Sequence, residues 1–94
     1  MKKIAEMTNE ELFKFTDNYI ACKTNENENL VRYSFFEVKV KMDMTENEID
    51  RFLKCSRIIL EEMNYKVYFT GAKFVYENAN RTVQDNELLI AVKE

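Results

Sequence analysis

The sequence predicts an α+β fold, a two-layer sandwich in which two helices cover one face of a four-stranded mixed sheet. Two segments begin with a helix-capping motif and continue with apolar residues at helical spacing, whereas others alternate apolar and polar residues as strands do. The expected element order is α-β-α-β-β-β. Because a chain of 94 residues supports one hydrophobic core, residues 1–94 are expected to form a single α+β domain.

The first helix is expected over residues 8–23. Thr8 and Glu11 match the capping box, in which the threonine side chain accepts from the amide three residues on and the glutamate reaches back. An apolar stripe at helical spacing follows, made of Leu12, Phe15, Tyr19, Ile20 and Cys22. Because Cys22 ends this stripe, we expect its thiol to be buried.

Residues 30–42 are expected to be extended. Their apolar residues alternate with polar ones, but the phase of the alternation changes at Phe35 and Phe36. Side chains of a strand alternate between faces, so one regular strand cannot bury both sets, and a bulge near Phe35 would reconcile them. The sequence leaves open whether this segment is one bulged strand or two.

The second helix is expected over residues 46–63. It begins with another capping box, Thr45 and Glu48. Helical spacing then continues through Ile49, Phe52, Leu53, Ser56, Ile59, Leu60 and Met63. Asn64 is expected to end this helix in the left-handed conformation that asparagine tolerates.

Three further strands are expected, at residues 65–70, 72–77 and 87–93, with a turn at Gly71 between the first two. Residues 78–86 are polar and too few for another packed helix. Because a strand–helix–strand crossover joins parallel strands, the strands before and after the second helix are expected to run parallel.

The charges are those of an ordinary solvated surface. Formal net charge is -3, from 14 Lys+Arg and 17 Asp+Glu, and the two signs are interspersed. This pattern lacks the basic patch that nucleic-acid-binding proteins display. The chain has no histidine and one glycine, which excludes a histidine-based triad, a histidine metal site and a glycine-rich phosphate loop.

The cysteines and the N-terminus indicate a cytoplasmic protein. Cys22 and Cys55 are too few for a disulfide framework and lack a metal-binding spacing. No apolar stretch approaches the ~20 residues of a membrane-spanning helix, and no apolar core of a signal peptide follows the first lysines. We expect no membrane association, no metal and no cofactor.

Without histidine, acid–base catalysis would depend on Asp, Glu, Lys, Tyr or Cys. Glu46 and Asp50 share a helix face and, with Glu48, form the nearest acidic cluster, which a divalent metal or acid–base chemistry would use. Capping and solvation explain Glu46 and Glu48 fully, so we favour the structural interpretation. No histidine is present to activate either thiol. The sequence therefore indicates a protein that is not an enzyme.

The sheet face away from the helices is the expected partner-binding surface. On the alternation inferred above, Tyr68 provides an aromatic anchor, and Val75 and Leu89 flank it. The expected rim charges are Lys39, Lys41 and Lys73. An apolar centre within a charged rim is how protein interfaces are built, although scattered apolar residues also occur on an ordinary solvated face.

These observations predict a small non-catalytic interaction module that binds another protein or a second copy of itself as a homodimer, with no small-molecule substrate evident. The abundance of Asn, Lys, Glu and Ile is typical of the AT-rich genomes of low-GC bacteria, phages and mobile elements. The concrete expectation is a phage- or mobile-element-encoded inhibitor that blocks host machinery, such as a nuclease or defence complex, by protein–protein contact.

The alternative is a nucleic-acid-binding accessory or regulatory protein that uses aromatic residues of the sheet face. Exposed aromatic side chains on a sheet can stack on bases, and residues 73–76 weakly match an RNA-binding strand pattern. The acidic net charge disfavours binding to phosphates.

Overall fold

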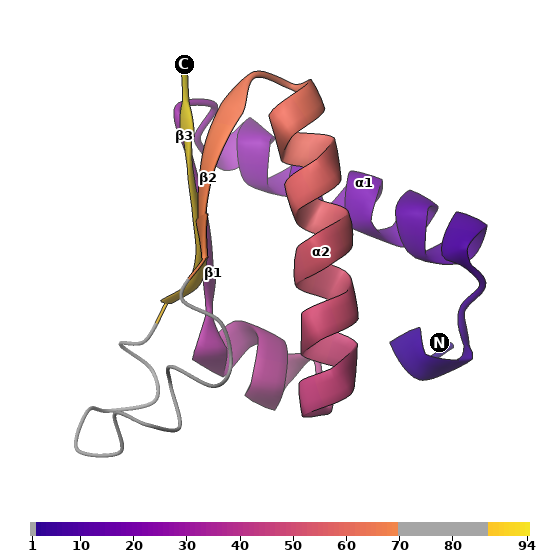
Figure 1. Ribbon diagram of the computed structural model, residues 1–94. Helices are drawn as coiled ribbons and strands as arrows, with labels where there is room; N and C mark the ends of the chain where they lie inside the picture. The colour runs from indigo at the N-terminus through magenta and orange to yellow at the C-terminus, as the bar shows by residue number, and fades with distance from the viewer. Residues whose placement is uncertain (1, 70–86) are drawn as a thin grey trace.

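The computed structural model describes residues 2–69 and 87–94, which form two layers. Both long helices lie on the same side of a small antiparallel sheet (Figure 1). In chain order the elements are the short helical turn η1 (Ile4–Glu6), helix α1 (Asn9–Glu26), strand β1 (Leu30–Ser34), the short helix η2 (Phe36–Lys41), helix α2 (Glu46–Glu62), and strands β2 (Tyr65–Phe69) and β3 (Glu87–Lys93).

The sheet of the described residues has three strands in the order β1-β3-β2. β3 runs antiparallel to both neighbours, so β1 and β2 are parallel to each other, as the crossover through α2 predicts. The α+β class is confirmed, whereas the four-stranded sheet and its order are not. The additional strand expected at residues 72–77 lies outside the described residues.

Both predicted capping boxes are present and start the two long helices. At α1 the Glu11 amide donates to Thr8 Oγ1 at 3.1 Å, and the Thr8 amide donates to Glu11 Oε1 at 2.9 Å. At α2 the corresponding bonds between Thr45 and Glu48 measure 3.2 and 2.9 Å. Asn64 follows α2 with φ of 68°, which is the expected left-handed conformation.

The prediction of an extended segment over residues 30–42 is wrong beyond Ser34. A third capping box starts the helix η2: the Glu37 amide donates to Ser34 Oγ at 3.1 Å, and the Ser34 amide donates to Glu37 Oε1 at 2.7 Å. η2 has π-type hydrogen bonding, with the Met42 amide donating to the Glu37 carbonyl five residues earlier at 3.0 Å. Phe35 and Val38 are buried at helical spacing.

The core lies between the helices and the sheet and centres on an aromatic cluster. The rings of Tyr33 and Phe52 stack with centroids 5.1 Å apart, and Tyr19 meets Tyr33 edge-on at 5.2 Å. The buried Tyr33 hydroxyl donates to Ser56 Oγ at 3.1 Å, so its polar atom is satisfied. The cluster joins α1, β1 and α2 in one core.

Cys22 is exposed, contrary to the prediction of a buried thiol. The residues of α1 that are buried are Leu12, Thr16 and Ile20, each four positions from the next. Cys22 lies two positions beyond Ile20, which rotates it by roughly 200° around the helix, away from the core.

Candidate functional site

The face of the sheet away from the helices is formed by alternate residues of all three strands, and we name it the outer sheet face. Pairing across the strands places its residues in two rows. The rows are Leu30, Val92 and Lys66, then Arg32, Ile90 and Tyr68. Val31 and Ala91, between the rows, and Tyr33, beyond the second row, have no exposed surface and face the helices.

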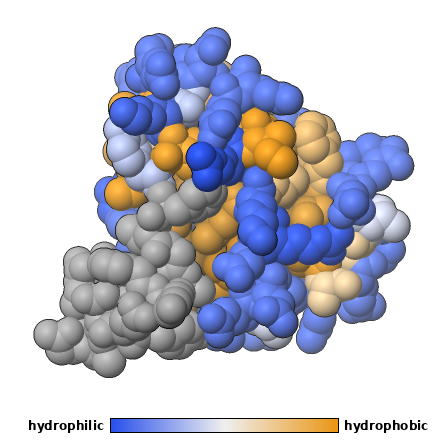
Figure 2. Space-filling model, in the orientation of Figure 1, coloured by the Kyte–Doolittle hydropathy of each residue, from blue (hydrophilic) through white to orange (hydrophobic). Residues whose placement is uncertain are grey.

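Apolar side chains occupy the middle of the outer sheet face. Tyr68 is 49% exposed and Val92 is 42% exposed, while Leu30 and Ile90 are half-buried. Hydrophobic side chains are visible along the left margin of Figure 2, beside the sheet and on the side away from the helices. In β3, Ile90 and Val92 therefore face outward, whereas Leu89 and Ala91 face the helices.

Two cations flank these apolar residues. The Arg32 guanidinium donates to the Glu87 carboxylate, and this hydrogen bond and the carboxylate charge raise the pKa of Arg32. The Lys66 ammonium lies 5.5 Å from the ring centroid of Tyr68, within cation–π range. Since Glu87 neutralises one cation, the described part of this face keeps a local positive excess, although the whole chain is acidic.

The structure brings together only part of the predicted partner-binding set. Tyr68 lies on the outer sheet face, as expected. Leu89 is fully buried: it pairs with Tyr33 on the helix-covered side, so its predicted placement is wrong. Both faces of β3 are apolar, so the alternation of its residues does not show which of them face the helices. The prediction therefore assigned the two faces of β3 the wrong way round. Val75 and Lys73 lie outside the described residues.

Lys39 and Lys41 do not belong to the sheet, because η2 replaces the strand on which they were predicted. The Lys39 ammonium donates to the Met44 carbonyl at 3.1 Å and so closes the connection to α2. The Lys41 ammonium lies 5.7 Å from the ring centroid of Phe36.

The alternation in the sequence places Tyr68 and Lys66 on this face, but sequence reasoning missed its other four residues: Leu30, Arg32, Ile90 and Val92. For β1, the polar Arg32 between Val31 and Tyr33 does show which residues face outward. For β3, no such signal exists, because Ile90 and Val92 are more apolar than the buried Ala91. Only the pairing of Ala91 with the buried Val31 shows which residues of β3 face the helices.

Glu48, one carboxylate of the acidic cluster Glu46, Glu48 and Asp50, has structural partners. Both oxygens of Glu48 accept backbone amides, from Thr45 at 2.9 Å and Ala5 at 2.8 Å, and these bonds lower its pKa. Within residues 2–69 and 87–94, no group of three Cys, Asp or Glu residues is arranged to hold a metal ion. No helix in these ranges is long and apolar enough to cross a bilayer.

A second polar cluster ties α1 to η2. Burial alone would raise the pKa of Glu37, but hydrogen bonds from Lys23, Tyr19 and the Ser34 amide outweigh burial and hold it below its usual range. The Lys23 ammonium lies 2.7 Å from Glu37 Oε2. Burial and the Glu37 carboxylate raise the pKa of Tyr19, so this phenol keeps its proton. The cluster therefore anchors α1 and has no activated nucleophile or base.

Comparison with known proteins yields no match to a family model, to a curated protein or to a solved structure. What the chain does is therefore inferred from its own residues, beginning with the outer sheet face.

Proposed function

We propose that this chain is a small non-catalytic protein-interaction module and that the outer sheet face is its binding surface. The observation that carries the proposal is the orientation of β3, which presents Ile90 and Val92 outward and Ala91 inward. Apolar surface gains roughly 25 cal/mol per Å² when a partner removes it from water. Together with the exposed ring of Tyr68, these side chains supply the apolar centre of an interface.

The charges around this centre favour a partner with an acidic surface. Arg32 and Lys66 flank the apolar residues, and Glu87 offsets one of the two charges. A second copy of the chain would bring the same cations toward each other, so the charges favour a different protein over a homodimer. The concrete form of the proposal is an inhibitor that covers a functional surface of host machinery, such as a nuclease or defence complex.

Nucleic acid fits the same face less well. Base stacking needs an open aromatic ring, and the Lys66 ammonium lies over one face of the Tyr68 ring. Phosphate binding needs several uncompensated cations, whereas Arg32 is already paired with Glu87. If nucleic acid is nevertheless the partner, Tyr68→Ala is expected to abolish RNA or DNA binding at low salt.

The test is affinity capture with the immobilised chain from the lysate of a low-GC bacterium, with and without nuclease, read by mass spectrometry. We expect a stoichiometric protein that survives nuclease treatment. Capture that disappears with nuclease would replace the protein proposal with the nucleic-acid one. Sedimentation velocity of the isolated chain tests for a homodimer, because a concentration-dependent dimer would identify a second copy of the chain as the partner.

A further inference from the structure

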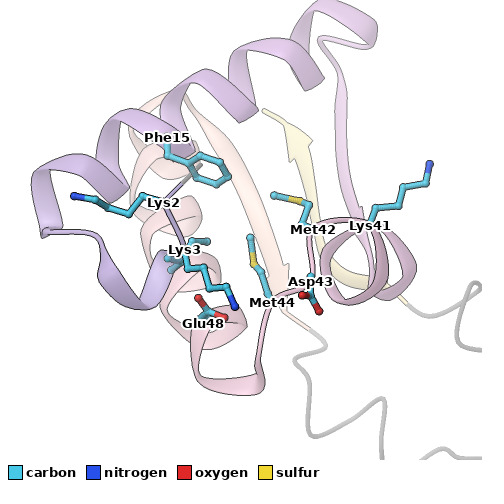
Figure 3. A pocket seen from close by; sticks show the side chains of 9 residues that line it. Lys2, Lys3, Phe15, Lys41, Met42, Asp43, Met44 and Glu48 are labelled. Atoms are coloured by element: carbon cyan, nitrogen blue, oxygen red, sulfur yellow. The ribbon is translucent and has the colours of Figure 1, made fainter.

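A pocket of about 270 Å³ lies between the N-terminal segment, α1 and the connection from η2 to α2. Figure 3 shows the side chains that line it, with Phe15 coming from α1 and Met42 and Met44 from the connection. It is formed by other elements than the outer sheet face. Because an apolar cavity of ~150 Å³ can hold one benzene ring and pockets for drug-sized ligands begin at ~300 Å³, this volume suits a molecule of about two fused rings.

The interior of the pocket is apolar. The Phe15 ring and the thioether side chains of Met42 and Met44 converge on it in Figure 3, and Ile4 completes the apolar lining. Ile4 and Met44 are buried, whereas Phe15 and Met42 are half-buried and keep apolar surface that a guest would cover. Removal of this surface from water favours an apolar guest.

The backbone of the connection brings its two methionines to the same pocket. Asp43, between them, has φ of 52°, a left-handed conformation that costs a non-glycine residue free energy. Two hydrogen bonds tie the connection to η2: the Met44 amide donates to the Val38 carbonyl at 3.3 Å, and the Lys39 ammonium donates to the Met44 carbonyl at 3.1 Å. The methionine side of the pocket is therefore anchored to the neighbouring helix.

The lining favours an aromatic guest over an aliphatic one. Thioether sulfurs make favourable contacts with aromatic rings, and methionine side chains adjust to the shape of a guest. Phe15 already belongs to the aromatic cluster, with ring centroids 5.9 Å from Phe52 and 6.5 Å from Tyr19. A guest ring would extend this cluster outward and gain the ring–ring contacts that aromatic side chains make.

Two of the lysines at the pocket mouth are compensated. The Lys2 ammonium lies 2.7 Å from a carboxylate oxygen of Glu11. Two backbone amides donate to the Glu48 carboxylate and lower its pKa, and the charge of Lys3 lowers it further. Lys3 therefore lies beside an ionised carboxylate, and neither lysine selects an anion.

The other two charged residues of the lining, Lys41 and Asp43, have opposite signs. Lys41 points away from the pocket in Figure 3, and its ammonium lies 5.7 Å from the ring centroid of Phe36. With Glu11 counted, three lysines and three carboxylates surround the mouth. The mouth therefore favours neither an anionic nor a cationic ligand.

We propose that this pocket binds a small neutral aromatic molecule of about two fused rings, which contacts Phe15 and the thioethers of Met42 and Met44. The apolar lining gives the affinity, and the balanced charges at the mouth leave no selection for a charged group. The proposal concerns a small molecule and is independent of the protein partner at the outer sheet face.

The test is a titration of the chain, labelled with ¹³C at its methionine methyl groups, with naphthalen-2-ol. We expect saturable shifts of the Met42 and Met44 methyl signals, while the signal of Met63, at the opposite end of α2 from Glu48, stays in place. Absence of saturable shifts at Met42 and Met44, or equal shifts at Met63, would overturn the proposal.

Matched ligands test the chemical class of the guest. Decahydronaphthalen-2-ol keeps the skeleton and the hydroxyl group but is not aromatic, so it is expected to bind about tenfold more weakly. Naphthalene-2-carboxylate and naphthalen-2-ylmethylammonium add a negative and a positive charge, and neither is expected to bind more tightly than naphthalen-2-ol. Equal affinity of the saturated alcohol would contradict an aromatic guest, and tighter binding of either ion would contradict a neutral one.

A pair of variants tests the contact with a thioether. Met42→Leu keeps an apolar side chain of similar size but removes the sulfur, so it is expected to weaken naphthalen-2-ol binding about threefold, read from the Met44 signal. Binding of decahydronaphthalen-2-ol is expected to stay unchanged. Met63→Leu makes the same change outside the pocket and is the matched control. The same weakening by Met63→Leu, or equal weakening of both alcohols by Met42→Leu, would contradict a sulfur–aromatic contact.

Discussion

The two faces of the sheet are built from the same three strands, yet they differ in what covers them. On the inner face Val31, Tyr33, Leu89 and Ala91 have no exposed surface, because α1 and α2 pack on that side. On the outer face Tyr68 and Val92 remain about half exposed in the described structure. Apolar content alone therefore does not mark the core of this protein, and the apolar residues of the outer face form the surface that we propose for binding.

The largest expected effect is on the inner face of β3. Leu89→Ala removes a fully buried side chain next to Tyr33 and is expected to lower the free energy of unfolding by about 2–5 kcal/mol. Urea unfolding followed by circular dichroism measures this loss. An effect below about 0.5 kcal/mol would show that Leu89 does not face the core.

The inner face stays covered partly because Glu37 holds α1 through Tyr19 and Lys23. Glu37→Gln is expected to lower the free energy of unfolding by about 1–2 kcal/mol at pH 7, because charge-assisted hydrogen bonds are lost. The folded pKa of Glu37 is depressed, so its contribution is present above the unfolded pKa of about 4.3 and is lost as the pH falls through the folded value.

The measurement is urea unfolding of the parent chain and of Glu37→Gln across pH 3–7. The difference between them should shrink as the solution becomes more acidic. A difference that stays constant over this range would mean that the Glu37 charge does not contribute.

A smaller effect is expected where β1 ends and η2 begins. Ser34→Ala removes the side-chain acceptor of the third capping box and is expected to cost about 1 kcal/mol. Thermal unfolding monitors the loss, and Ser34→Thr, which keeps a hydroxyl, is the matched control. Equal losses for the two variants would contradict a capping role.

The smallest effect on stability is expected on the outer face. Val92→Ser shortens an exposed side chain of the same strand as Leu89 and is expected to change the free energy of unfolding by less than about 0.5 kcal/mol. Urea unfolding measured alongside Leu89→Ala gives the contrast directly. A loss comparable to that of Leu89→Ala would place Val92 in the core.

Local signals predict part of this fold well. The capping boxes at Thr8 and Thr45 gave the starts of both long helices, because their hydrogen bonds join residues only three apart. The same signal is present at Ser34 and Glu37, but the sequence analysis followed the alternation of Phe36, Val38, Val40 and Met42, which is typical of a strand, and so predicted an extended segment. In the structure this capping box starts the short helix η2, where the buried residues Phe35 and Val38 are three positions apart.

The candidate site is harder to predict than the helices because it depends on strand pairing. Tyr68 was placed on the correct face. Which residues of β3 face the helices depends on the residues that pair with Tyr33 and Val31, and such long-range pairing is not encoded in the local sequence. β3 also departs from simple alternation: the register shifts next to Tyr33, and both Leu88 and Leu89 are buried.

The central claim, that the outer sheet face binds a protein, is tested most directly by two matched aspartate variants. Val92→Asp places a charge on the outer sheet face, and Ile58→Asp places one at an equally aliphatic position of α2 that is 59% exposed. Both are expected to fold. The protein that the parent chain captures should be retained by Ile58→Asp and lost by Val92→Asp, whereas equal capture by both variants would contradict the claim.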